Sequence, residues 1–334
     1  MICKAAILGT GGMGRRHFAS LRELGIPVTA VCDADRAASE KFTADMGIKG
    51  AAIFDSFGKM LESADFTILF ICLPPFAQDD QFEKAALSGK HIFIEKPIAL
   101  QTATGARMVR AAKKGGITSM VGFHMRKGAA ISRLAQLIQN GEAGKAVLFN
   151  AQYQCNSLHT PWWIHQDLSG GQIFEQAIHI YDLCRYFFGD PKFVEGIMAN
   201  VCHNHLRAYT VEDVSVCLAG FTTGALASIT ANNCAIPGKW TGKITVVFEN
   251  LTAEFDDHNH GVITYTKDPG LKREELQSED NPYFAEVKEF AECSEKGVET
   301  SCGIIEGFKS LCFVETAVSS AKLDGVKLPV NTHY

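Results

Sequence analysis

A glycine-rich loop near the start of the chain limits the possible folds more than any other feature of the sequence. The segment AILGTGGMG has the pattern GxGxxG and lies between an apolar run and a stretch with helical character. Such glycines allow a tight turn, close approach of the backbone to a pyrophosphate, and close packing of a helix on a strand. The pattern therefore predicts a dinucleotide-binding turn. The loop residues expected to contact the cofactor are Gly9, Thr10, Gly11, Gly12, Met13 and Gly14.

A carboxylate stands where such a domain binds the adenine ribose. Asp33 ends the next apolar run, VTAVCD, 19 residues after Gly14. A carboxylate here accepts hydrogen bonds from the ribose hydroxyls and repels the 2'-phosphate of NADP, which favours NAD. Arg15, Arg16 and Arg36 lie close in sequence and leave NADP open. The simpler alternative is a structural turn in which Asp33 only caps a loop.

The first third of the chain alternates short apolar runs with longer amphipathic stretches. Strands are expected at 5–8, 28–32, 68–73, 91–94 and 119–123, and helices at 14–24, 37–46, 78–88 and 102–114. Continuous apolar strands separated by helices are typical of a parallel sheet covered on both faces. We therefore expect residues 1–124 to form an α/β domain with a doubly wound parallel sheet.

After about residue 125 the pattern changes to alternating or β-branched runs with fewer helices between them. Strands are expected at 147–155, 193–204, 213–221, 225–232, 243–248 and 252–255, and helices at 129–140, 174–187, 283–293 and 303–320. Such runs predict a mostly antiparallel, open sheet. Residues 125–334 are therefore expected to form a second, α+β domain.

Charge and hydropathy argue against several classes of protein. Lys and Arg number 32 against 37 Asp and Glu, and neither sign forms a long block, so a nucleic-acid partner is not expected. No apolar stretch is long enough for a membrane span or the core of a signal peptide, which predicts a cytoplasmic protein. The eleven cysteines include no CxxC pair and are expected to be reduced thiols.

Two further segments carry groups suited to proton transfer. In HIFIEKP, Glu95 and Lys96 follow an apolar run and should face the nicotinamide end of a cleft, where a lysine can hold or transfer a hydroxyl proton. In SGGQIFEQAIHIYD, helical spacing places Glu175, His179 and Asp182 on one face, so that carboxylates can orient an imidazole. The alternative for Glu95 and Lys96 is an ion pair at the surface. The alternative for Glu175 and His179 is a solvated pair on an amphipathic helix.

Together these motifs resemble the Gfo/Idh/MocA oxidoreductases, a family that includes inositol dehydrogenases and glucose-fructose oxidoreductase. The matching segments occur in family order over nearly the whole chain: GTGGMG, the strand end at Asp33, ICLPP, GKHIFIEKPIAL, VGFHMR, SGGQIFEQAIHIYD, TVEDVSV and PYFAEVKEF. The resemblance implies a Rossmann domain, a mixed sheet that supplies the substrate wall, NAD or NADP as hydride acceptor, and cofactor contacts by Leu73 and Pro74. It also implies that Lys96 is the lysine of the EKP motif and His179 the acid/base histidine.

The chain departs from the family pattern at several positions. Glu175 stands where most members have aspartate, so the carboxylate is kept with one more methylene. Gln172 replaces the third glycine of the usual GGG, Ala177 replaces a glycine, and Gln78 stands where a histidine commonly follows the two prolines. These changes leave the acid/base pair in place but prevent transfer of a particular sugar from the family.

The remaining candidates are aromatic and histidine side chains. Trp162 and Trp163 could stack on a sugar or cover the nicotinamide, although one of them could instead be a core residue. His124 is a candidate for substrate contact and Arg126 for cofactor contact, or both could serve a structural network. Two HxH pairs, His203 with His205 beside Cys202 and His258 with His260, have no evident third ligand, so we expect surface histidines and no metal.

The leading hypothesis is NAD-dependent oxidation of a secondary alcohol of a sugar, cyclitol or sugar derivative. In it His179 takes the hydroxyl proton, Lys96 holds the oxygen or is itself the base, and Glu175 orients His179. One alternative is redox-assisted cleavage of a glycoside through a transient 3-keto sugar, with NAD recycled. Another is a non-catalytic dinucleotide sensor. The resemblance also implies a homodimer or homotetramer built on the open sheet.

Overall fold

The computed structural model describes residues 3–158 and 160–334. Their contacts form two compact units, and each consists of more than one segment of the chain. The first unit contains residues 3–123, 283–308 and 334, and the second contains residues 124–282 and 309–333. No helix within the described ranges combines the length and the apolar character needed to cross a membrane.

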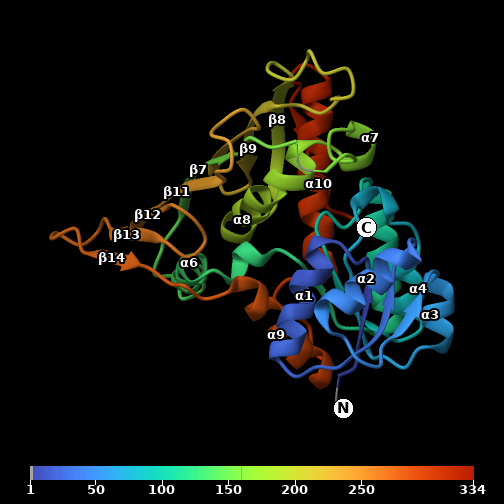
Figure 1. Ribbon diagram of the computed structural model, residues 1–334. Helices are drawn as coiled ribbons and strands as arrows, with labels where there is room; N and C mark the ends of the chain where they lie inside the picture. The colour runs from blue at the N-terminus through green and yellow to red at the C-terminus, as the bar shows by residue number, and fades with distance from the viewer. Residues whose placement is uncertain (1–2, 159) are drawn as a thin grey trace. The chain divides into compact units, whose positions relative to one another are not determined.

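The first unit is built on a six-stranded parallel sheet (Figure 1). Its strands are β1 (Ala5–Leu8), β2 (Val28–Cys32), β3 (Ala52–Phe54), β4 (Ile68–Ile71), β5 (His91–Ile94) and β6 (Ser119–Val121). They lie in the order β3-β2-β1-β4-β5-β6. From β1 the chain adds strands first on one side (β2, β3) and then on the other (β4, β5, β6), so the strand order reverses between β1 and β4. Open parallel sheets bind their ligands at such a reversal point. The predicted doubly wound sheet is thus confirmed, and of its six strands the short edge strand β3 is not among those expected from the sequence. The helix at Phe57–Ser63 that follows β3 is also not among the expected elements.

Helices lie on both faces of this sheet. They are α1 (Gly12–Glu23), α2 (Arg36–Met46), α3 (Phe57–Ser63), η1 (Pro75–Ala77), α4 (Gln81–Leu87), α5 (Thr102–Gly115) and α9 (Pro282–Lys296). Phe290 of α9 meets the rings of Phe70 and Phe93 edge-on, at centroid distances of 5.6 and 5.7 Å. This buried contact explains why residues 283–308 belong to the first unit, in contrast to the expected single division at residue 124.

The second unit contains a nine-stranded sheet in the order β14-β13-β12-β11-β7-β10-β9-β8-β15. All strand pairs are antiparallel except β7 with β10, which confirms the mostly antiparallel sheet. The strands are β7 (Ala146–Gln154), β8 (Pro191–Ala199), β9 (Val214–Phe221), β10 (Leu226–Asn232), β11 (Thr241–Phe248), β12 (Leu251–Phe255), β13 (Gly261–Tyr265), β14 (Arg273–Leu276) and β15 (Leu328–Pro329).

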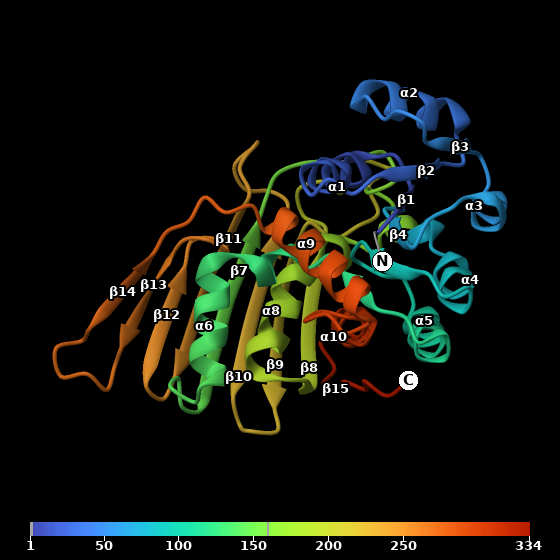
Figure 2. The same ribbon diagram turned by 90° about the horizontal axis from the view of Figure 1, so that it is seen from below.

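Helices cover one face of this sheet, and α6 and α8 lie along it in Figure 2. The helical segments are η2 (His124–Lys127), α6 (Ala129–Gln139), α7 (Gln166–Ser169), the π-helical turn η3 (Ile173–Ala177), α8 (Ile178–Phe188) and α10 (Ile304–Lys322). Along β9, Cys217 and Ala219 are buried whereas Val216 and Leu218 are exposed. This alternation is expected of a sheet with one covered and one open face.

Candidate functional site

The glycine loop connects β1 to α1, and its glycines meet different steric demands. Gly9 has φ +95°, and a Cβ there would lie 2.6 Å from the carbonyl oxygen of Cys72. A Cβ on Gly14 would lie 2.3 Å from the carbonyl oxygen of Gly9. At Gly11 and Gly12 a Cβ would meet no atom within 4 Å. Two glycines therefore permit close packing, while open space lies beside the N-terminus of α1, where a pyrophosphate binds in such folds.

Asp33 lies beside this loop at the end of β2. Its Oδ2 accepts hydrogen bonds from the backbone N–H of Thr10 at 2.9 Å and from the Thr10 hydroxyl at 2.8 Å. The same carboxylate also accepts the backbone N–H of Asp35 through Oδ1 at 3.2 Å. Asp33 therefore holds the turn of the glycine loop and places a carboxylate next to the open space.

The three arginines near the loop all have partners of their own. Arg15 forms an ion pair with Asp45 at 3.0 Å, and Arg36 pairs with Glu40 at 2.9 Å. The guanidinium of Arg16 lies over the ring of Tyr283, 4.3 Å from its centroid. Because each cation already faces an acidic or aromatic group, the local charges favour NAD over the additional phosphate of NADP.

The predicted residues Leu73, Pro74, Glu95 and Lys96 follow β4 and β5 at the same edge of the sheet as the glycine loop. Glu95 is buried, and its Oε1 lies 2.6 Å from Nε2 of His17, while Oε2 accepts the backbone N–H of Lys96 at 3.2 Å. A Cβ on Gly122 would lie 2.9 Å from the Glu95 carboxylate. Glu95 thus faces the interior of the first unit and fixes the backbone at Lys96.

Glu175 lies in the π-helical turn η3, directly before α8. Its Oε2 accepts a hydrogen bond from the indole Nε1 of Trp163 at 3.0 Å. Trp163 is 1% exposed and packs with Tyr209 and Val211, whereas Trp162 is partly buried against the same cluster. Of the two predicted tryptophans, Trp163 is therefore a core residue that also holds the Glu175 carboxylate. Wide π turns of this kind occur frequently at functional sites.

His179 is buried on α8 within a group of three imidazoles. The ring of His124 meets the His179 ring edge-on at a centroid distance of 4.7 Å and the His258 ring at 5.6 Å. Burial lowers the pKa of His258, so this neighbour is neutral around pH 7. The structure thus brings the predicted residues His124 and His179 together and adds His258, which the sequence analysis had assigned to the surface.

Arg126 forms a buried ion pair with Asp182 of α8. Its Nε and one terminal nitrogen each lie 2.7 Å from a carboxylate oxygen, and both side chains are almost wholly buried. Ser310 donates a further hydrogen bond to Asp182 at 2.7 Å. The pair ties η2 to α8 within the second unit, and binding of the cofactor by Arg126 stays a prediction.

Glu212 is a buried residue that the sequence analysis did not single out beyond its motif TVEDVSV. Its Oε1 accepts the backbone N–H of Ile173 at 2.8 Å, at the start of the turn that carries Glu175. Burial raises the pKa of Glu212 to about 7. Gly171 has φ +93°, and a Cβ there would lie 2.1 Å from Oε2 of Glu212. The second glycine of SGGQ is therefore required by this carboxylate, a contact that sequence spacing does not reveal.

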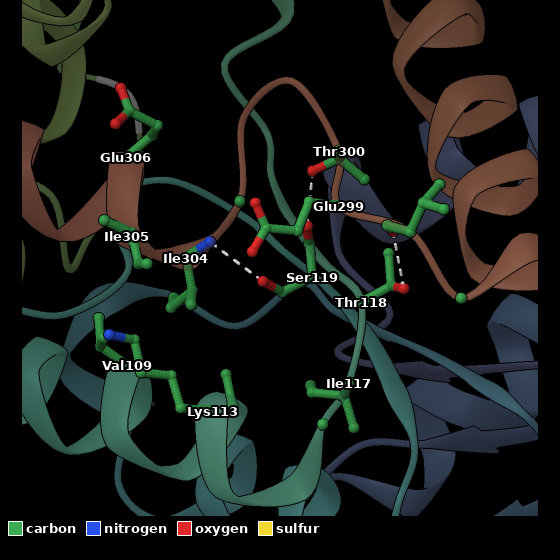
Figure 3. A pocket seen from close by; sticks show the side chains of 15 residues that line it. Val109, Lys113, Ile117, Thr118, Ser119, Glu299, Thr300, Ile304, Ile305 and Glu306 are labelled. Carbon is green, nitrogen blue, oxygen red and sulfur yellow. Dashed lines mark hydrogen bonds between the residues drawn. The ribbon is translucent and has the colours of Figure 1, made fainter.

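A cavity of about 450 Å³ lies elsewhere in the first unit (Figure 3). It is lined by parts of α5, the start of β6 and residues 297–306, with Lys113, Ser119 and Glu306 among its polar side chains. Because Ser119 begins β6, the cavity lies at the amino ends of the strands, opposite the edge that carries the glycine loop. Among the described residues that line it there is no predicted site residue.

Comparisons with known proteins agree with this architecture. A family model described as the GFO/IDH/MocA oxidoreductase family, NAD-binding Rossmann fold, matches residues 3–123. The model of the GFO/IDH/MocA C-terminal domain matches residues 131–254. The two matches together span more than half of the chain.

Individual relatives have low sequence identity to this chain, but the matches cover most of its length. An uncharacterised oxidoreductase of Bacillus subtilis, YrbE, is 23% identical over 91% of this chain and 90% of its own length. The scyllo-inositol 2-dehydrogenase (NAD(+)) of the same organism is 26% identical over 69% of this chain and 67% of its own. A levoglucosan dehydrogenase solved with NADH and levoglucosan superposes with a TM-score of 0.89 at 17% identity, covering 98% of this chain and 99% of that one. At that identity the superposition shows a common fold.

Proposed function

The chain belongs to the GFO/IDH/MocA family of oxidoreductases and has its NAD-binding Rossmann domain, and from this premise we propose that it oxidises a secondary alcohol of a sugar, cyclitol or related polyol. The proposal rests mainly on one observation: the predicted cofactor and substrate residues of the first unit lie at the same edge of the parallel sheet. There the glycine loop after β1, Leu73 and Pro74 after β4, and Lys96 after β5 follow three adjacent strands. Ligands of open parallel sheets bind along such an edge.

The residues of the first unit fit NAD. The open space at Gly11 and Gly12 would take the pyrophosphate at the N-terminus of α1, and Asp33 would accept the ribose hydroxyls. When bound, NAD supplies the hydride acceptor for the alcohol carbon. Lys96 holds the alcohol oxygen and stabilises the charge that develops on it, and Glu95 fixes the backbone at that lysine.

The second unit supplies the proton acceptor. His179 removes the hydroxyl proton as the C–H bond breaks, and Glu175, held by Trp163, orients the histidine. His124, whose ring meets the His179 ring at a centroid distance of 4.7 Å, contacts the substrate in this proposal. The relatives named as inositol and sugar dehydrogenases support a polyhydroxylated ring as the substrate class.

A parallel screen tests this proposal. Sugars, inositols and glycosides are offered with NAD and, separately, NADP, and reduction of the nicotinamide is followed by absorbance. We expect net NADH formation with at least one polyol, and loss of turnover in Lys96→Ala and in His179→Ala. Lys114→Ala, which removes an exposed lysine of α5, is the control and should retain full activity.

Three outcomes would contradict the proposal. Near-normal turnover in both variants would remove Lys96 and His179 from the mechanism. Cleavage of a glycoside without net NADH would instead favour the redox-assisted glycosidase. NAD binding with no turnover of any compound would favour a dinucleotide sensor.

We also infer a homodimer or homotetramer formed through the open face of the nine-stranded sheet. Strand register places five exposed apolar side chains on that face: Leu148, Ile197, Val216, Leu218 and Leu226. A group of exposed apolar side chains on one sheet face is typical of an interface between subunits. Light scattering should give a multiple of 36.4 kDa, and Val216→Glu should yield the monomer. A wild-type monomer at every concentration would contradict the inference.

A further inference from the structure

A cluster of metal-ligating side chains lies at one end of β9 and β10 in the second unit. Ligand atoms of Cys202, Asp213 and Cys234 all lie within 4.8 Å of one another. The Nδ1 atom of His203 lies 3.2 Å from Oδ2 of Asp213 and 3.9 Å from Sγ of Cys234. Four potential ligands thus converge, where the sequence showed only Cys202 and the HxH pair without a third ligand.

The pairing of β9 with β10 brings these residues together. Asp213 directly precedes β9 and Cys234 follows β10, and Val214 is paired with Asn232 at that end of the hairpin. The backbone N–H of Asn233 also donates to the carbonyl oxygen of Asp213 at 2.8 Å. Cys202 and His203 reach the same point in the connection between β8 and β9. Sheet register therefore brings together ligands that lie between Cys202 and Cys234 in the chain.

The spacing of the ligand atoms fits a tetrahedral zinc ion. Zinc binds thiolate sulfur at about 2.3 Å and imidazole nitrogen or carboxylate oxygen at about 2.0–2.2 Å, so neighbouring ligand atoms of a tetrahedral site lie about 3.3–3.8 Å apart. The distances from His203 to Asp213 and to Cys234 are close to this range. The ligand atoms of Cys202, Asp213 and Cys234 lie within 4.8 Å of one another, and on metal binding they contract while the His203 ring nitrogen, which lies outside that group, moves toward Sγ of Cys202.

From this geometry we propose that Cys202, His203, Asp213 and Cys234 bind one zinc ion. Two thiolates and an imidazole favour zinc over magnesium or calcium, which prefer oxygen ligands. Binding releases the thiol proton of each cysteine to solvent. Four protein ligands leave no open position, so the site is structural.

The loop is already organised for such an ion. The buried carboxylate of Asp213 accepts the backbone N–H groups of Val201 at 2.8 Å, Cys202 at 2.7 Å and His203 at 2.9 Å. These bonds hold Cys202 and His203 beside the carboxylate without using their side chains. Cys202 is also the one exposed thiol among the eleven, all of which are free, and it gives the ion a route from solvent.

The zinc site is connected by ring contacts to the residue that holds Glu175. The His203 ring stacks on Tyr209 at a centroid distance of 4.5 Å, and Tyr209 meets Trp163 edge-on at 6.3 Å. Trp163 in turn donates to Glu175. The ion therefore stabilises the segment between β8 and β9 and, through it, the wall next to Glu175. The metal assignment itself does not depend on the proposed reaction.

The test is the metal content of the full-length protein, purified under reducing conditions without a metal-affinity tag. After dialysis against zinc, mass spectrometry of the metal should find about one zinc per chain, as expected for one closed site. Cobalt offered in place of zinc should produce a thiolate-to-cobalt charge-transfer band. Cys234→Ser and His203→Gln should each lose the band and most of the zinc.

Matched controls separate this site from adventitious binding. His205→Gln alters the other histidine of the HxH pair, and Cys293→Ser removes a half-buried thiol of the first unit. Both should keep the zinc and the cobalt band, and circular dichroism should show that every variant folds. The proposal is overturned if reduced wild-type protein takes up neither metal, or if Cys234→Ser keeps both. A Cys202–Cys234 disulfide with no metal uptake after reduction would also overturn it.

Discussion

The indole Nε1 of Trp163 donates a hydrogen bond to Oε2 of Glu175 across 3.0 Å. Trp163 is 1% exposed and belongs to the packed core of the second unit. The bond therefore joins this core to a carboxylate in the turn directly before α8, the helix that carries His179. A buried side chain has a fixed orientation, and it transmits that orientation to the carboxylate it contacts. The hydrogen bond therefore helps to hold the Glu175 carboxylate in one position.

Trp163→Phe should lower kcat by about tenfold or more, because hydrogen bonds to charged groups contribute about 1.5–3 kcal/mol. KM should change little, since the substitution alters the orientation of Glu175 rather than substrate contacts. Steady-state kinetics on the substrate found by the screen measures both constants. Trp240→Phe, which alters a half-exposed indole, is the control. A rise in KM with unchanged kcat would contradict the assigned role.

Asp33→Ala should raise KM for NAD and increase the ratio of kcat/KM with NADP to that with NAD by about tenfold, equivalent to about 1.4 kcal/mol. The substitution removes both the ribose acceptor and the repulsion of a 2'-phosphate. Thr10→Val controls for the role of Asp33 in holding the glycine loop, because it removes the 2.8 Å hydrogen bond from the Thr10 hydroxyl and leaves the carboxylate in place. An unchanged cofactor ratio in Asp33→Ala would exclude Asp33 from ribose binding.

Glu212 should make the stability of the protein depend on pH. Its pKa is about 7 in the folded protein against an ordinary value of 4.5, so the folded state binds this proton more tightly than the unfolded state. Its contribution is fully present below pH 4.5 and is lost as the pH rises through about 7.

Glu212→Gln removes this titration and keeps an acceptor for the N–H of Ile173. Between pH 4.5 and 8 the free energy of unfolding of the variant should therefore rise relative to wild type by up to about 3 kcal/mol, from 2.5 pH units at about 1.36 kcal/mol each. Urea denaturation at a series of pH values measures the difference. If the free energy of unfolding of Glu212→Gln instead fell relative to wild type as the pH rises, the raised pKa of Glu212 would be refuted.

Arg126→Met should reduce the free energy of unfolding by about 3–5 kcal/mol, because it leaves the buried carboxylate of Asp182 without its cation. Adding Asp182→Leu should recover much of the loss, and the double-mutant cycle gives the coupling energy. Arg133→Met is the matched control, since its partner Glu274 is only partly buried and such pairs contribute about 1 kcal/mol or less. Equal losses in Arg126→Met and Arg133→Met would contradict this account.

Local patterns were sufficient to predict the parallel sheet of the first unit and the mostly antiparallel sheet of the second. The alternation of continuous apolar runs with helices indicates the parallel sheet because strands buried on both faces must be apolar throughout. The glycine loop is equally local: its turn and the open space at Gly11 and Gly12 follow from the short segment between Gly9 and Gly14. The family motifs added Lys96 and His179, which periodicity alone could not assign to a reaction.

Other features depend on partners that are distant in the chain. Residues 283–308 join the first unit because Phe290 contacts Phe70 and Phe93, which no boundary in composition reveals. Arg126 could be placed at the end of a strand, but its buried pairing with Asp182 requires the approach of α8.

The sequence by itself determined the dinucleotide-binding fold and the family's acid/base candidates, because turn chemistry and hydrophobic period act over a few residues. Tertiary structure alone decided which carboxylate meets which donor and which thiols converge on His203. The physical reason is that strand register and helix packing set distances between residues far apart in the chain. The candidate zinc site, assembled where β9 and β10 pair, is the clearest consequence.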